Sequence, residues 1–114
     1  MFLILTALVD QPRHGYGIVQ EVARLSDGQM QLKVGTLYGA LDRLTGEGLL
    51  ALDRDEIEAG RLRRYYRLTD RGVAELTAQT RRLAANAAAA AARLRERGIT
   101  VPGVGGLDIV GGTA

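Results

Sequence analysis

The side chains that could do chemistry in this chain are mostly arginines, and they gather in one stretch. Residues 61–71 (RLRRYYRLTDR) carry five arginines and one acid, whereas residues 53–58 (DRDEIE) carry four acids and one base. A local basic stripe is an electrostatic footprint for phosphate, and the plain alternative is a solvated charged surface. The formal net charge is only +2, so the distribution of charge is more informative than its total.

Catalytic and metal-binding chemistry has few side chains to draw on. The 114 residues contain no cysteine and one histidine, His14. Disulfides, thiolate metal sites, a cysteine nucleophile and a two-histidine zinc site are therefore excluded. We interpret His14 as a turn residue, and the acids Asp53, Asp55, Glu56 and Glu58 lack the glycine and terminal glutamate of a calcium loop. We expect no catalytic residue, no metal and no cofactor.

Length and composition indicate one small globular domain. Hydrophobic residues make up 46% and charged residues 25% of the chain, which is too short for a multidomain enzyme. The apolar start, residues 1–9, is less than half of the roughly 20 residues that a membrane helix needs, and it lacks the basic flank of a signal peptide. We therefore expect a buried helix there, no membrane partner, and a cytoplasmic protein.

Three helices are predicted before the charged region. Residues 2–9 are apolar nearly all round, as expected of a buried helix. A polar turn over 10–15 precedes a helix over 16–25, with Gly28 at its C-terminal end. A connector over 29–34, with room for a short strand, leads to a third helix over 35–46. The two amphipathic helices place their apolar residues at helical spacing, namely Ile18, Val19, Val22, Leu25, Leu37, Ala40, Leu41 and Leu44.

A hairpin and a long helix are predicted to follow. Residues 49–54 and 63–68 are predicted strands on either side of a charged loop over 55–62, and the second strand alternates its side chains between two faces. Thr69 is a suitable N-cap for a helix that runs to about residue 97, where Gly98 and Pro102 stop it. At about 1.5 Å per residue this helix would be roughly 40 Å long. Residues 98–114 are glycine-rich and are expected to form a flexible tail, with short ordered stretches around 107–110.

The long helix carries a heptad seam that indicates a partner helix. The simplest partner is a second copy of the chain, so we expect a homodimer; the alternative is a lone helix stabilised by its alanines. The seam residues are Val73, Leu76, Thr80, Leu83, Ala87, Ala90 and Leu94.

Three short helices followed by a hairpin are the order of a winged helix. The predicted fold class is therefore mostly α with a small β-hairpin wing, a winged helix-turn-helix plus a long C-terminal helix. Its parts would be a DNA-binding domain over 1–69, a dimerisation helix over 70–97 and the tail over 98–114. In such a fold the third helix can enter the major groove of double-stranded DNA while the wing meets the flanking backbone.

The chain resembles the PadR-like winged-helix transcriptional regulators. The stretches that carry the resemblance cover most of residues 1–72; they are HGY at 14–16, GTLY at 35–38, AL at 40–41, RL at 43–44, EGL at 47–49, YRLT at 66–69 and Gly72. The resemblance implies a repressor that dimerises through its C-terminal helical part and binds a pseudo-palindromic operator. In some members a small-molecule effector releases the DNA, and the single long helix resembles the smaller subclass.

Two departures from the family pattern stand out. Gly39 occupies a position that is usually proline, which should leave the helix intact but looser. The chain has no tryptophan, the residue that drug-binding members often place at the dimer interface. The multidrug ligand mode is therefore not expected here.

The expected DNA contacts lie on the third helix, at its entrance and on the wing. Four of them have structural alternatives: Tyr38 could belong to the core, Thr36 could cap the helix, Tyr16 could be structural, and Arg43 could pair with Glu47 at i,i+4. The full set is Tyr16, Lys33, Thr36, Tyr38, Gly39, Arg43, Arg61, Arg63 and Arg64.

A second function remains open at this point, since a winged helix can also be a protein–protein interaction module without DNA specificity. Convergence of Lys33, Arg43 and the wing arginines on one surface would favour DNA. Pairing of those arginines with the acids of residues 53–58 would favour the interaction module.

Overall fold

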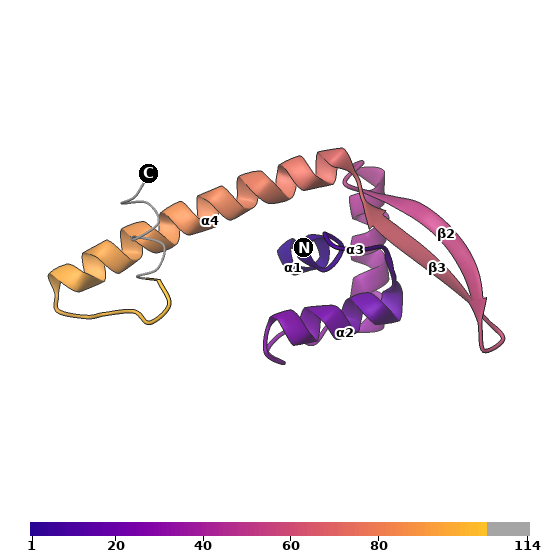
Figure 1. Ribbon diagram of the computed structural model, residues 1–114, viewed down its shortest axis with the longest axis horizontal. Coiled ribbons are helices and arrows are strands. Elements are labelled where there is room, and N and C mark those ends of the chain that lie inside the picture. The colour runs from indigo at the N-terminus through magenta and orange to yellow at the C-terminus, as the bar shows by residue number, and fades with distance from the viewer. Residues whose placement is uncertain (105–114) are drawn as a thin grey trace. The chain divides into compact units, whose positions relative to one another are not determined.

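The fold, a computed structural model that describes residues 1–104, confirms a mostly helical chain with a small antiparallel sheet (Figure 1). The expected ordered stretch at 107–110 lies outside the described residues. Two compact units divide the chain, Met1–Leu76 and the remainder from Thr77 onward. The elements in chain order are α1 (Phe2–Ala7), β1 (Arg13–His14), α2 (Gly15–Leu25), α3 (Val34–Gly46), β2 (Leu50–Glu58), β3 (Arg61–Leu68) and α4 (Asp70–Glu96).

The core of the first unit is built from the apolar faces that the sequence predicts. Helix α1 buries Ile4, Leu5 and Ala7, because its residues are apolar nearly all round. Helices α2 and α3 turn their periodic apolar residues inward, whereas Leu25 at the end of α2 stays 37% exposed. The core residues are Ile4, Leu5, Ala7, Leu8, Ile18, Val22, Leu37, Ala40, Leu41, Leu44, Leu49, Leu50 and Tyr66.

The end of α2 forms as expected, and the connector after it does not. Asp27 and Gly28 adopt left-handed backbone conformations (φ 51° and 78°), and the Gly28 N–H donates to the carbonyl of Ala23 at 2.7 Å. This hydrogen bond satisfies one of the last carbonyls of the helix, which have no partner within it. Residues 29–33 contain no strand, so the prediction of a short strand there is wrong.

The hairpin is longer than the sequence pattern predicts. The expected charged loop over 55–62 is wrong: most of it is strand, and the turn is confined to Ala59 and Gly60, whose φ values are 50° and 78°. Two successive positive φ angles match the twist of the flanking strands. Opposite charges face each other across the strands, which favours pairing of polar segments; the facing pairs are Asp55↔Arg64, Glu56↔Arg63 and Glu58↔Arg61.

A third strand completes the sheet, in the order β1-β3-β2. Arg13 pairs with Tyr66 and His14 with Tyr65, so part of the turn expected over 10–15 is strand β1. A strand of two residues has no detectable period, and its partner lies some fifty residues further along the chain. Figure 1 shows β2 and β3 extending beyond the cluster of α1, α2 and α3.

Helix α4 begins and ends where its caps predict. The Thr69 hydroxyl accepts the Gly72 N–H at 3.0 Å and donates to the carbonyl of Gly48 at 2.7 Å. After Glu96 the chain turns at Gly98 (φ 80°), and the Ile99 N–H returns to the Leu94 carbonyl at 3.0 Å. None of the helices within residues 1–104 combines the length and the apolar composition that crossing a bilayer requires.

Candidate nucleic-acid interface

A groove of about 390 Å³ lies between the start of α2, the first turns of α3 and strand β3. Its apolar part comes from the helices and its charge from the wing. The lining residues are Gly15, Tyr16, Val19, Val34, Leu37, Tyr38, Arg61 and Arg63. Tyr16, Tyr38, Arg61 and Arg63 were predicted as DNA contacts, and the fold brings these four together. An apolar floor beside two guanidinium groups can hold a sugar–phosphate chain, because the sugar packs while the phosphate pairs.

The two tyrosines stand at the surface of the groove. Tyr38 is 46% exposed and Tyr16 is 58% exposed, so neither belongs to the core. The Tyr38 hydroxyl lies over Gly15, where an added Cβ would come within 2.6 Å of it. The absence of a side chain at Gly15 therefore allows Tyr38 to reach across from α3 to the start of α2.

Acidic neighbours divide the wing arginines into two groups. Arg64 forms an ion pair with Asp55 at 3.3 Å, and Arg54 forms ion pairs with both Asp53 and Glu56, each at 2.7 Å. These two carboxylates also raise the pKa of Arg54. The remaining acid of β2, Glu58, accepts a hydrogen bond from the Tyr65 hydroxyl. The acids of β2 are therefore occupied by residues other than Arg61 and Arg63.

Arg61 and Arg63 remain outside the ion pairs of residues 1–104. The Arg63 Nε–H is also shielded from solvent and has no hydrogen-bond partner in that part of the chain. Such a donor is costly to leave unsatisfied, so a bound anion would be favourable there. In the described residues these two guanidinium groups are thus available to a partner of negative charge.

Five predicted contacts do not line this groove: Arg64 lies on β3, and the other four lie on α3 or at its start. Lys33 is the N-cap of α3 and is exposed, and the helix starts without a side-chain cap. Thr36, Gly39 and Arg43 are exposed in the part of the helix that follows. Within residues 1–104 Arg43 forms no ion pair with Glu47, so the alternative role considered for it is not realised.

The groove also contains residues that the sequence did not mark as functional. Gly15, Val19, Val34 and Leu37 line it, and Val34 is 64% exposed at the first position of α3. The sequence pattern assigns Val34 to the connector before α3, so its exposure became visible only in the fold. The others carry no signal of their own, because their role comes from the approach of α2, α3 and β3.

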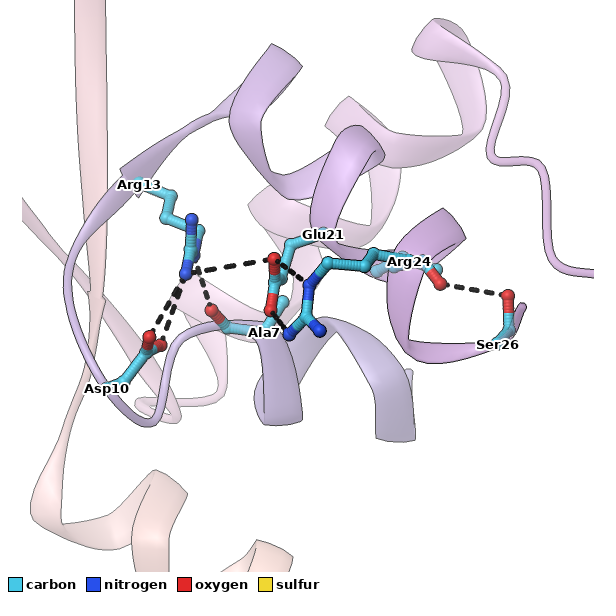
Figure 2. A network of polar contacts seen from close by, with 7 residues as sticks. Ala7, Asp10, Arg13, Glu21, Arg24 and Ser26 are labelled. Carbon is cyan, nitrogen blue, oxygen red and sulfur yellow. Dashed lines mark hydrogen bonds and ion pairs between the residues drawn. The ribbon is translucent and has the colours of Figure 1, made fainter. Parts of the chain in front are cut away.

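A network of charged residues links β1 to α2 (Figure 2). The Arg13 Nε–H donates to the Ala7 carbonyl at 2.8 Å, and the same guanidinium meets Asp10 at 3.1 Å and Glu21 at 3.9 Å. A hydrogen bond from Arg24, more than the charge of Arg13, lowers the pKa of Glu21. The network ties the end of α1 to α2 and fixes the strand that leads into the groove.

Comparison with known proteins points to one family. Residues 4–78 match the family described as "Transcriptional regulator PadR-like family". The protein named Transcriptional regulator Rv3488 from Mycobacterium tuberculosis is 39% identical over 80 residues, which cover 70% of this chain and 71% of that protein.

Solved structures show the same fold. A transcriptional regulator from Clostridium thermocellum has a TM-score of 0.64 at 27% identity, covering 72% of this chain and 79% of the other. The structure of Bacillus subtilis PadR in complex with operator DNA has a TM-score of 0.62 at 28% identity, covering 69% of this chain and 44% of that one.

Proposed function

This chain belongs to the PadR-like family of transcriptional regulators, and on that premise we propose that it binds double-stranded DNA in a sequence-specific manner. The observation that carries the proposal is the groove in which Arg61 and Arg63 stand free of the wing's own acids. The structure of a relative in complex with operator DNA supports the same partner. An interaction module without DNA specificity is the alternative that the experiment below must exclude.

The parts of the first unit take different roles in this proposal. The exposed side of α3 enters the major groove, where Thr36, Gly39 and Arg43 face the base edges. Lys33 lies at the rim, at the start of that helix. The remaining contacts are to the DNA backbone, and they are Tyr16, Tyr38, Arg61, Arg63 and Arg64. Arg64 is the weakest of them because Asp55 already neutralises part of its charge.

The assembly and its regulation complete the proposal. Residues 1–69 form the DNA-binding domain, and helix α4 within 70–97 pairs with its copy, so that a homodimer meets the two halves of a pseudo-palindromic operator. We also assign the chain to the smaller subclass of the family, which its single long helix resembles. In this role the protein is a cytoplasmic repressor, relieved by a small-molecule effector.

The first test is a selection of genomic DNA fragments by the purified protein. We expect enrichment of one pseudo-palindromic motif. Affinity is then measured at one salt concentration on that motif and on a random duplex. Fragments recovered without a common sequence, and equal affinities for the two duplexes, would overturn the proposal and leave the interaction module.

Replacement of the long side chain on α3 tests sequence recognition. Arg43→Ala should cost about 1–3 kcal/mol on the selected motif and much less on random DNA, because a lost base contact matters only where the base is correct. Equal losses on the two duplexes would show that Arg43 only positions the protein on the backbone.

A further inference from the structure

The only histidine of the chain has a defined hydrogen-bonding state. His14 is the N-cap of α2, and its Nδ1 accepts the backbone N–H of Gly17 at 3.1 Å. A neutral imidazole has one donor and one acceptor, so an accepting Nδ1 places the proton on Nε2. The cap therefore fixes the tautomer and leaves Nε2–H as the donor of the ring.

Neighbouring side chains also fix the orientation of the ring. The Tyr65 ring meets His14 edge to face, with centroids 5.3 Å apart and planes at 82°. Tyr65 is itself held, because its hydroxyl bonds to Glu58 and the Arg54 guanidinium lies 4.0 Å from its ring centroid. Arg13, the preceding residue, is engaged with Asp10 and α2 (Figure 2). The imidazole thus has little freedom to turn away from its position.

His14 borders a second hollow of about 290 Å³, which adjoins the groove and which we name the His14 cavity. Within residues 1–104 its lining contains three guanidinium groups and no acid: His14, Gly15, Tyr38, Arg61, Leu62, Arg63 and Arg64. Helix α2, which is 11 residues long, starts at this cavity with Gly15. The first N–H groups of a helix have no partner within it and attract anions.

We propose that the His14 cavity receives one phosphate of the DNA backbone and that the Nε2–H of His14 donates a hydrogen bond to it. This assignment rests on the proposed function. The arginines supply charge, whereas His14 supplies a neutral donor whose direction is set by its own capping bond. One side chain thereby joins the start of α2 to the DNA, and a hydrogen bond to an ionised acceptor is among the stronger kinds.

A pair of substitutions separates the cap from the contact. Serine caps helices well, so His14→Ser should melt at a higher temperature than His14→Ala, which loses both the cap and the donor, while both variants lose the ring contact with Tyr65. We expect His14→Ser to bind the selected operator about tenfold more weakly than the wild type. The dependence of affinity on salt should stay unchanged, because a neutral donor releases no counterion.

Nuclear magnetic resonance gives a direct readout, since a sole histidine makes the imidazole signals unambiguous. The free protein should show the proton on Nε2, and this signal should shift when the duplex is added. Inorganic phosphate at matched ionic strength should leave it in place. An equal shift with inorganic phosphate would overturn the assignment to the DNA backbone.

Failure of the assignment and failure of the proposed function look different. If the wild type binds the selected operator and His14→Ser binds it equally well, His14 is only a cap and the assignment is overturned. A salt dependence that becomes shallower in His14→Ser would also overturn it, because it would mean a charged contact. If the wild type binds no duplex at all, the proposed function itself fails.

Discussion

At the scale of single residues, the charge that the wing presents depends on which acid pairs with each arginine. Glu56 and Glu58 face Arg63 and Arg61 across the strands, but they bond instead to Arg54 and to Tyr65. Charge counting along the sequence cannot distinguish these outcomes, because both partners are within reach. The consequence is a basic groove on a hairpin whose total charge is nearly balanced.

Removal of one groove arginine should weaken DNA binding in a way that salt reveals. Arg63→Ala should reduce affinity for every duplex alike, and the slope of log affinity against log salt should become shallower by about one. Arg67→Ala is the matched control, since Arg67 is exposed on the same strand but does not line the groove. A slope that is unchanged in Arg63→Ala would mean that this arginine does not touch the backbone.

The charged network of Asp10, Arg13, Glu21 and Arg24 predicts a dependence of stability on pH. The pKa of Glu21 is lowered in the fold by its bond to Arg24, so its stabilising effect is present above the ordinary glutamate pKa of about 4.3 and is lost as pH falls through the lowered value. Glu21→Gln should therefore reduce the free energy of unfolding at pH 7, and the difference from the wild type should shrink toward pH 3.

Urea unfolding at the two pH values measures that difference. Glu47→Gln is the control, because Glu47 lies exposed after α3 and does not pair with Arg43. A difference between Glu21→Gln and the wild type that stays constant from pH 7 to pH 3 would contradict the role given to the carboxylate.

At the scale of elements, helix α3 combines a packed side with an exposed side that includes the glycines Gly39 and Gly46. Its core residues are buried, whereas a Cβ added at Gly39 or Gly46 would have no atom of a neighbouring element within 4 Å, so an alanine would fit at either. Glycine within a helix costs about 1 kcal/mol relative to alanine. Gly39 therefore weakens α3 locally, and close approach to the bases would be the compensating gain.

Stability and binding should change in opposite directions at this position. Gly39→Ala should raise the free energy of unfolding by up to about 1 kcal/mol and lower operator affinity, because the added methyl group enters the space next to the bases. Gly46→Ala makes the same change at the last residue of α3 and should not weaken binding. Thermal melts and operator titrations of both variants provide the comparison. Operator affinity undiminished in Gly39→Ala would contradict the docking of α3.

At the scale of the whole molecule, the predicted seam of α4 does not have a uniform environment. Leu76 is partly buried and packs against the core of the first unit, whereas Val73 and Leu83 are 50% and 52% exposed. A charge at Leu76 would damage the winged helix itself, so Leu83 is the better position for testing the dimer.

Replacement of Leu83 should break the proposed homodimer without unfolding the first unit. Leu83→Glu would bury a charge in the apolar seam, so sedimentation at micromolar concentration should show a monomer where the wild type shows a dimer. Ala85→Glu introduces the same charge at an exposed position off the seam and should remain dimeric. A wild type that sediments as a monomer would refute the homodimer.

Local signals in the sequence determined most of the helical framework. The apolar periodicity of α2 and α3 and the caps at Thr69, Gly28 and Gly98 act over a few residues, so their effect can be recognised without the fold. The family resemblance of the winged-helix part rests on motifs of the same short range.

Only the tertiary structure decided the pairing of β1 with β3, the full length of the hairpin and the partners of the wing arginines. Each depends on residues that are distant in sequence, such as His14 beside Tyr65, or on a choice among several acids of the neighbouring strand, as for Arg63 and Arg64. Hydrogen bonds and ion pairs of this kind form only after packing has set strand register, because register fixes which side chains face each other. The sequence therefore contained the arginines and acids of the wing, and the fold determined which of these arginines stayed outside an ion pair.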